Sequence, residues 1–489
     1  MLDADLPPDA DPAVATAEAG TPPQPSPKVR TGYRTVALIV AAALFMEFLD
    51  ATVLATALPT MARDFGVRAP QMSIALTSYL LSLAIFIPAS AHMADRFGGR
   101  TVFCAAIGVF MLGSLACAQA QNVPEMILAR FFQGIGGAMM LPVGRLLLLR
   151  SVPKSDLINA MSWLLVPALA GPILGPPLGG FIVQWLNWRW IFYINLPVGA
   201  VAIWLAGRFI ADVREATPDR FDTPGFVMSA VSLGCLLFGF EMTSRPGEAL
   251  MSVPLLAVGL AMGAAYVRYA LRRSDAILDL TLLRDPTFRL SVIAGSLTRI
   301  TQGAQPFLLP LMMQLGFGYT PARSGSITVA TAVGSLAMKS MAPRVLRRFG
   351  FRDALIWNGV IAAGCYAVCG LFRPDWPQWA IVGMLALCGF AMSFQFTAYN
   401  AIAYDAIPDD KMSRATSFYT TFQQLMLSLG ICTGALGLRA AMLVRGHVDP
   451  SLGDFSVAFW VVTAISVLAT IWNVRFARDA GARISGHQV

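Results

Sequence analysis

The sequence predicts an all-α polytopic membrane protein, and three observations lead to that fold class. Hydrophobic residues make up 56% of the 489 residues and charged residues only 13%, about half of the ~25% found in soluble domains. Apolar stretches of about 20 residues recur along the chain, each long enough to cross a ~30 Å hydrocarbon core as a helix. Lysine and arginine gather in alternate loops between these stretches. The composition therefore excludes most soluble enzymes, disordered chains and coiled coils.

The apolar stretches are flanked by two polar tails. Residues 1–31 are rich in Pro, Ala and Asp and contain no apolar run, which predicts a disordered cytoplasmic tail rather than a signal peptide. Residues 477–489 form a second cytoplasmic tail. Between them we predict fourteen membrane helices, at about residues 35–59, 72–93, 101–120, 125–148, 157–185, 190–210, 223–243, 251–270, 289–316, 322–342, 354–372, 378–404, 415–441 and 456–474.

The distribution of basic residues predicts which side of the membrane each loop faces. If the N-terminus is cytoplasmic, the loops on that side hold roughly 24 Lys and Arg and the opposite loops roughly 8, which is the asymmetry that the positive-inside rule describes. A thirteen-helix count would place Arg475, Arg478 and Arg483 outside. The asymmetry therefore favours fourteen helices with both termini in the cytoplasm.

A sequence repeat divides the chain into two halves. The string RFGGR at residues 96–100 follows the second predicted helix, and RFGFR at residues 348–352 follows the tenth. Two six-helix bundles, residues 32–210 and 286–476, fit this repeat when residues 211–285 contribute two inserted helices. Repeats of this kind are typical of secondary transporters, whose substrate site lies between the halves near the bilayer midplane.

Four motifs in order along the chain carry a family resemblance. They are LDATVLATALP at residues 49–59, DRFGGR at 95–100, Arg130 with QGIGG at 133–137, and GPILGPPLGG at 171–180, which WRWIFYINLP at 188–197 follows. The chain resembles the fourteen-helix drug:proton antiporter branch of the major facilitator superfamily over almost all of residues 35–475. The string GAMMLPVGR at residues 137–145 is similar to a subgroup named as multidrug exporters. The resemblance implies a major facilitator fold and proton-driven export.

The chain also departs from the family pattern. Ala91 and Thr101 replace a glycine and a basic residue of the loop motif, and Ala55 replaces an asparagine of the first-helix motif. Glu47 places a charge where the family is usually uncharged. The last two positions bear on coupling and specificity, so the resemblance implies no particular substrate.

Two carboxyl groups lie within the first predicted helix. A charge in the hydrocarbon region costs at least a few kcal/mol, so such a residue normally faces a polar cavity and serves function. Glu47 and Asp50 are three residues apart and point to one helix face, where two carboxyl groups titrate as a unit. Arg130 reaches a similar depth on the fourth helix, since each residue advances a helix by ~1.5 Å. We expect Asp50, Glu47 and Arg130 to form a proton-coupling site; the alternative is a static buried ion pair.

The ninth predicted helix carries a polar face. Arg299 lies near mid-depth, and Gln302, Gln305 and Pro306 follow it, which predicts a kinked helix that forms a wall of the substrate cavity. Arg145 and Lys339 are best explained by snorkelling to the membrane surface, and Glu241 and Asp405 near helix ends are predicted to be interfacial. Since four cations within the membrane region exceed the carboxylates there, an organic anion such as a carboxylate or siderophore is the alternative substrate.

The loop after the second helix is the predicted gating loop. Asp95, Arg96, Gly98 and Arg100 make up its core, and Asp95 at the helix end is placed to pair with basic groups or with a helix N-terminus across the loop. In the second half Arg347 stands at the position of Asp95. We therefore expect this latch to be stronger in the first half.

The fifth predicted helix combines glycine and proline. Glycines at four-residue spacing let a neighbouring helix approach closely, and prolines remove backbone donors and bend the helix. Such a helix at the domain interface is suited to sealing the pathway against proton leak, or to packing alone. The residues concerned are Gly171, Pro172, Gly175, Pro176 and Gly179.

Other kinds of chemistry find little support. The seven cysteines lie in apolar runs and the three histidines are scattered, so we predict no metal site, no cofactor and no catalytic cluster. The basic residues lie in short loops, which argues against nucleic acid, and the chain lacks a P-loop for ATP. We expect a monomeric transporter of the cell inner membrane that moves small molecules and protons across the lipid bilayer. A membrane sensor or membrane-embedded enzyme is the remote alternative, because no soluble output domain is present.

Overall fold

The computed structural model describes residues 33–152, 160, 163–164, 167–212, 221–243, 249–273, 276–405, 407–408 and 411–482. The predicted tail 1–31 lies outside the described residues, as do positions 483–489 of the second tail. Within the described ranges the chain is helical and contains no strand. Its helices are α1 (Tyr33–Asp64), α2 (Ser73–Phe97), α3 (Gly99–Gln119), α4 (Val123–Ser151), α6 (Ala170–Trp185), α7 (Trp190–Tyr193), α8 (Asn195–Phe209), α9 (Thr223–Thr243), α10 (Ala249–Ala270), α11 (Pro286–Leu311), α12 (Pro321–Cys369), α13 (Gln378–Ile402), α14 (Met412–Arg445) and α15 (Leu452–Asn473).

The predicted membrane helices correspond to helices of the structure where it describes them, with two differences in how they are joined; residues 157–159, 161–162 and 165–166 of the fifth predicted segment lie outside the described residues. The tenth and eleventh segments merge into α12, which is interrupted only at Gly350, where φ is 69° and ψ is 174°. The sixth segment divides into the short α7 and α8. Ten described helices are long and apolar enough to cross a membrane. The polypeptide is an all-α polytopic protein, as predicted.

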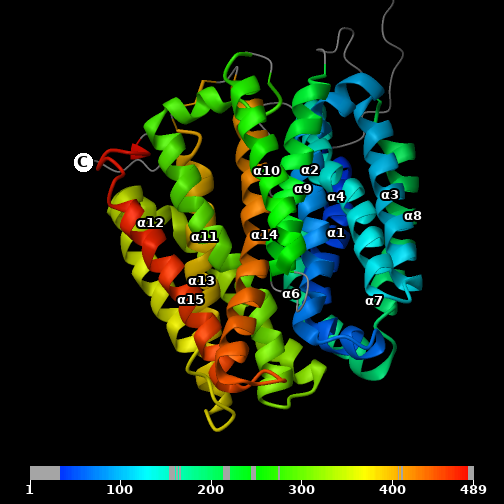
Figure 1. Ribbon diagram of the computed structural model, residues 1–489. Coiled ribbons are helices and arrows are strands. Elements are labelled where there is room, and N and C mark those ends of the chain that lie inside the picture. Colours follow the sequence, from blue (N-terminus) through cyan, green and yellow to red (C-terminus); the bar gives the residue numbers. More distant parts are fainter. Residues whose placement is uncertain are drawn as a thin grey trace, which may run out of the picture.

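The helices form two bundles side by side, with α9 and α10 between them in the view of Figure 1. One bundle contains α1–α4, α6 and α8, and the other contains α11–α15. The bundles meet where α6 packs on α12 and where α2 packs on α14. We call the end at which α1 begins and α2 ends the tail end, which is uppermost in Figure 1, and the end at which α1 ends and α12 begins the far end.

The hydrophobic core is shared at the far end and divided at the tail end. A single cluster of buried side chains joins Leu58 and Met61 of α1 to Phe307 and Leu311 of α11. Toward the tail end, one cluster draws only on the first half, around Phe103, and another only on α10 and the second half. Since burial of apolar area is the main attractive force between packed elements, the two halves are held together chiefly at the far end.

Both copies of the loop motif use glycine for the same conformational reason. Gly98 between α2 and α3 has φ of 94°, and Gly350 within α12 has φ of 69°. Residues with a Cβ rarely adopt positive φ, so only glycine makes this turn without strain. The sequence repeat is therefore also a repeat of backbone geometry.

Candidate functional site

Asp50 and Arg130 form an ion pair inside the first bundle. Arg130 Nη1 on α4 donates to Asp50 Oδ2 on α1 at 2.6 Å, and neither side chain is exposed to solvent. Depth along the helices predicted that Arg130 pairs with Asp50 or Glu47, and in the structure the partner is Asp50. A buried ion pair needs further hydrogen bonds, because its attraction alone does not offset the cost of removing both charges from water.

Those further hydrogen bonds come from one amide on α4 and one on α8, and a hydroxyl of α3 binds both amides. Gln133 Nε2 and Asn195 Nδ2 each donate to Asp50 Oδ1 at 3.0 Å. Both amides also donate to Ser114 Oγ on α3, at 2.8 and 3.1 Å. Asp50 Oδ1 thus accepts two hydrogen bonds, and the two donors share Ser114 Oγ as a second acceptor. Sequence reasoning did not select these three residues, although Asn195 lies within the WRWIFYINLP motif.

Arg130 is held on its other side by α2. Its Nε donates to the backbone carbonyl of Ala75 at 3.1 Å, and its guanidinium lies 4.5 Å from the centroid of the Tyr79 ring. A cation over an aromatic face is stabilised when both are withdrawn from water. Arg130 Nη2 is buried without a hydrogen-bond partner in the described part of the chain. The arginine therefore has two unused N–H groups, both on Nη2.

Glycines of the fourth-helix motif bring the helices close enough for this network. A Cβ added to Gly136 would lie 2.5 Å from the carbonyl oxygen of Ala106, and one added to Gly134 would lie 2.6 Å from Ser82 Cβ. On the facing helix, a Cβ at Gly113 would lie 2.5 Å from Gln133 Cα. Close helix contacts of this kind need small residues. The motif thus positions Arg130 and Gln133 through backbone contact with α2 and α3.

Glu47 lies one turn before Asp50 on α1, and its side chain is buried. Its Oε2 has no hydrogen-bond partner within the described residues. The structure therefore places Glu47 near the pair that was predicted with it, and within the described residues it forms no ion pair with Arg130. A buried carboxyl oxygen without a partner is costly to keep ionised, so this group is suited to carrying a proton.

A central cavity of about 260 Å³ lies between the two bundles. One wall is lined by residues of α1 that follow Asp50, namely Ala51, Thr52, Ala55 and Thr56, and the other by α11, α12 and α13. The walls are mostly apolar with a few hydroxyl and amide groups, as in most small-molecule sites. Its lining residues include Ala51, Thr52, Ala55, Thr56, Pro172, Pro176, Gln305, Pro306, Thr328 and Ser335.

The predicted cavity residues of α11 divide between two places. Gln305 lines the central cavity. Arg299 instead lies within the second bundle, where it donates to Gln302 Oε1 at 2.8 Å and to Gln423 Oε1 at 3.4 Å and stacks 3.9 Å above the Phe396 ring. Gln302 donates to the carbonyl of Met392 at 3.0 Å. Among the described residues, no carboxylate forms an ion pair with Arg299.

The glycine stripe of α6 packs directly on α1. A Cβ at Gly171 would lie 2.9 Å from the carbonyl oxygen of Phe45, and Cβ atoms at Gly175 and Gly179 would collide with the hydroxyls of Thr52 and Thr56. On the other side of the same helix, a Cβ at Gly325 of α12 would collide with the carbonyl of Pro176. The helix therefore lies at the interface of the two halves, and Pro172 and Pro176 also line the central cavity.

The gating loop is bound by a residue that sequence reasoning missed. Asp212, after α8, accepts from the Thr101 amide at 3.4 Å and from the Thr101 hydroxyl at 3.1 Å. Arg100 donates to the carbonyl of Ile210 at 3.3 Å. Asp95 lies in the last turn of α2 with Arg96, whose guanidinium lies 5.3 Å from the Phe97 ring. A threonine at position 101, where the family often has a basic residue, supplies the partner for Asp212.

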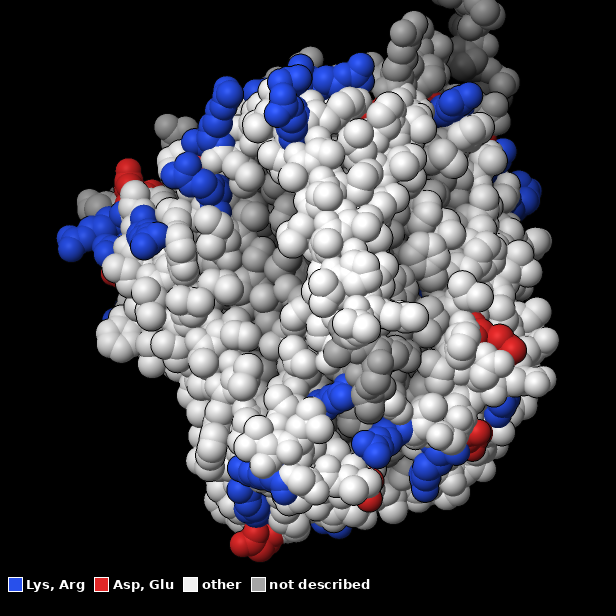
Figure 2. All heavy atoms as spheres, viewed as in Figure 1, with Lys and Arg blue, Asp and Glu red and all other residues white. Residues whose placement is uncertain are grey.

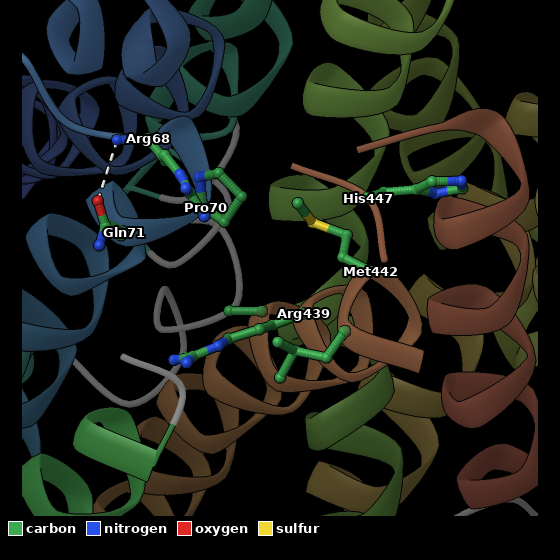
Figure 3. A pocket seen from close by; sticks show the side chains of 8 residues that line it. Arg68, Pro70, Gln71, Arg439, Met442 and His447 are labelled. Atoms are coloured by element: carbon green, nitrogen blue, oxygen red, sulfur yellow. Dashed lines mark hydrogen bonds between the residues drawn. The ribbon is translucent and has the colours of Figure 1, made fainter. Parts of the chain in front are cut away.

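A second cavity, of about 180 Å³, opens between the halves at the far end (Figure 3). Gln71 lies in the turn η1 (Ala69–Met72), Arg68 directly precedes that turn, and Arg439 lies on α14.

The prediction that Glu241 is interfacial is wrong, because α9 packs into the adjacent seam and leaves Glu241 only 1% exposed. Asp405, by contrast, is half-buried and accepts from the Gly481 amide at 3.1 Å. In the described part of the chain, no group of His, Cys, Asp and Glu is arranged to hold a metal ion.

The family model of the Major Facilitator Superfamily matches residues 40–431. The chain belongs to the Major Facilitator Superfamily. It is therefore a multi-pass membrane transporter of small molecules rather than an enzyme. The two packed bundles and the cavity between them are the arrangement that this superfamily uses.

Two bacterial relatives in the Major Facilitator Superfamily cover nearly the whole chain. The "Probable transport protein HsrA" of Haemophilus influenzae is 36% identical over 444 residues, which are 90% of this chain and 95% of the relative. The "Putative multidrug resistance protein MdtD" of Yersinia enterocolitica is 37% identical over 465 residues, 92% and 97% of the two chains. The crystal structure of the POT family transporter PepTSo shares the fold, with a TM-score of 0.68, 13% identity and coverage of 94% of this chain and all of that one.

Proposed function

We propose that the protein is a proton-coupled antiporter that exports amphipathic organic compounds by alternating access. One observation carries the proposal: α1 holds Asp50 against Arg130, while the residues that follow Asp50 line the central cavity. A change in the charge of Asp50 therefore acts on the helix that contacts the substrate. The names of the MdtD relatives support an export role.

The proposal places the tail end in the cytoplasm, with both termini on that side of the bacterial inner membrane. In Figure 2 basic side chains gather along the upper left edge of the molecule, at the tail end, and others lie at the far end. The orientation therefore rests on the loop counts, roughly 24 Lys and Arg against 8, and on the positive-inside rule. The shared far-end core then closes the outer side, and the divided tail-end cores correspond to a cytoplasm-facing state. This state leaves Asp50 paired with Arg130.

The coupling step follows from that pair. In the outward-facing state a proton from outside neutralises Asp50, and Arg130 then loses the charge that holds it to α1. The freed arginine retains its contacts with Ala75, Gln133 and Tyr79 on the α2 and α4 side. The two halves rock to the cytoplasm-facing state, the proton leaves Asp50 and the ion pair re-forms as substrate enters. Glu47 is the second proton-binding group on the same helix.

An organic anion remains the second candidate substrate. Arg299 is buried and lacks a carboxylate partner among the described residues. A buried cation that is satisfied only by amides and an aromatic ring attracts anions strongly, since the surrounding dielectric constant is low. The central cavity itself, with its proline, alanine and threonine walls, favours an amphipathic compound.

Inverted membrane vesicles with an imposed pH gradient test the proposed function. Cationic drugs, neutral drugs and organic anions are added in turn, and proton release from the vesicles is followed with a fluorescent pH probe. We expect cationic or neutral amphipathic compounds to release protons. Release with organic anions alone would reverse the substrate preference, and release with none of the three classes would contradict proton coupling.

A further inference from the structure

The inserted helix α9 does more than connect the two halves. It lies over the seam between α2 and α14 in Figure 1 and packs on both helices. A small apolar cluster joins Leu237 of α9 to Leu81 and Ile85 of α2 and to Cys432 of α14. A connecting segment alone has no need to bury residues against both bundles, so α9 is part of their interface.

Glu241 joins the two bundles through its carboxyl group. Ser73 Oγ of α2 donates to Glu241 Oε1 at 2.6 Å, and Cys432 Sγ of α14 donates to Glu241 Oε2 at 3.0 Å. Glu241 is 1% exposed, and Ser73 and Cys432 are equally buried. The two oxygens of one side chain thus take donors from opposite halves. Hydrogen bonds to a charged acceptor are stronger than those between neutral groups.

Neighbouring groups along the seam between α2 and α14 act both for and against its closure. Ser428 Oγ of α14 donates to the carbonyl of Thr77 on α2 at 3.3 Å, one turn toward the tail end. Toward the far end, Arg68 of the first half and Arg439 of α14 line one cavity, so two like charges lie at the same opening between the halves (Figure 3). Arg439 Nη1 is buried, and the described residues offer it no hydrogen-bond partner. Two like charges on opposite halves repel, so they favour separation of the seam.

We propose that Glu241 is a clasp that holds the far end of the transport pathway closed, by binding Ser73 of one half and Cys432 of the other. Opening of the far end separates α2 from α14 and breaks at least one of these bonds, after which the repulsion between Arg68 and Arg439 assists the movement. The inference rests on the proposed alternating access of the two halves. It makes the inserted pair α9 and α10 a component of the outer gate, and Glu241 a positioning residue for it.

Electron spin resonance distances across the far end test the clasp without any transport measurement. Spin labels are attached at Arg63→Cys and Val448→Cys, which are exposed positions of the first and second halves. The background replaces six native cysteines by alanine and carries Cys432→Ser, which keeps a donor for Glu241. We expect Glu241→Ala to raise the ratio of far-open to far-closed molecules about ten- to hundredfold, the effect of losing a hydrogen bond to a charged group.

Two further variants make the result specific. Ser73→Ala removes one donor and leaves the carboxyl group in place, so it should shift the distances in the same direction even if Glu241→Ala folds poorly. Glu125→Ala removes an exposed carboxylate at the same end, which among the described residues accepts from the Gln121 amide and the Asn122 side chain at the start of its own helix, and should change nothing. Distances unchanged in both Glu241→Ala and Ser73→Ala, or shifted equally in Glu125→Ala, would overturn the clasp. Loss of transport with the shift intact would bear only on the proposed function.

Discussion

Asp50 of α1 and Arg130 of α4 are joined by a 2.6 Å hydrogen bond between fully buried charges, eighty residues apart in the sequence. Amide groups of α4 and α8 donate to Asp50, and both also donate to the Ser114 hydroxyl of α3. An ion pair so enclosed responds mainly to protonation of Asp50. A mutation that removes the pair should therefore abolish proton coupling and spare substrate binding, because the residues that line the cavity lie on the other face of α1.

Asp50→Asn should abolish transport driven by a pH gradient while substrate exchange across the vesicle membrane continues. Asparagine preserves the shape of the side chain but cannot alternate between a charged and a neutral form. It also leaves Arg130 buried without its counter-ion, a loss of about 3–5 kcal/mol for a broken buried pair, so the thermal midpoint should fall.

Gradient-driven uptake and exchange are compared in the same vesicle preparation. Asp64→Asn, on the same helix but half exposed at the far end, is the matched control, and full gradient-driven uptake by Asp50→Asn would remove Asp50 from the coupling mechanism.

Glu47→Gln should lower the number of protons released per substrate molecule and leave the Asp50–Arg130 pair intact. The unpartnered Oε2 of Glu47 is replaced by an amide that carries no exchangeable charge. Proton release and substrate uptake are measured together in proteoliposomes. An unchanged ratio of protons to substrate would mean that Glu47 serves packing alone.

Gly175→Leu should reduce transport and increase passive proton leak. Even a Cβ at this position would collide with Thr52, so a leucine forces α6 away from α1 at the edge of the central cavity. Overpacking of this kind costs about 1–3 kcal/mol. Leak is read as the decay of an imposed pH gradient in proteoliposomes without substrate. Gly207→Leu on α8, where nothing lies within 4 Å of the added Cβ, should leave the decay unchanged, and an equal decay in the two variants would argue against a sealing role for α6.

Gly98→Ala should destabilise the fold by about 1–3 kcal/mol, since a positive φ is costly for a residue with a Cβ. The added methyl group would also meet the carboxylate of Asp212, 2.5 Å away. Unfolding in detergent gives the thermal midpoint. Asp212→Ala in the same chain should recover the part of the loss that is due to the collision and none that is due to φ. A midpoint equal to that of the native protein would show that the turn relaxes without cost.

Local signals predicted most of the fold and part of the site. Hydropathy identifies membrane helices because each must satisfy its own backbone in lipid, and depth limited the partner of Arg130 to Asp50 or Glu47. Gln133 and Asn195 were noted only as motif residues and Ser114 not at all, because short polar side chains hardly alter hydropathy and their common partner is set by tertiary packing. Glu241 was misplaced because a position near a helix end says nothing of which neighbours cover it. The division between Arg299 and Gln305 was accessible from the sequence: six residues turn a helix by about 600°, or 240°, so the two side chains face different directions.

Arg299 decides between the two substrate classes. Its guanidinium contacts two glutamine side chains and an aromatic ring in the second bundle, away from the central cavity. If the natural substrate is an amphipathic cation or neutral compound, Arg299→Gln should leave its apparent KM within about twofold, because the cavity walls are unchanged. If the substrate is an organic anion that reaches this arginine, the loss of one buried charge partner should raise the apparent KM for anions by tenfold or more, the scale of about 1.4 kcal/mol per tenfold. The measurement is uptake into inverted vesicles as a function of concentration for one compound of each class. Arg323→Gln, an exposed arginine at the start of α12, controls for the change in net charge, and a raised KM for anions in Arg299→Gln alone would assign the protein to anion export.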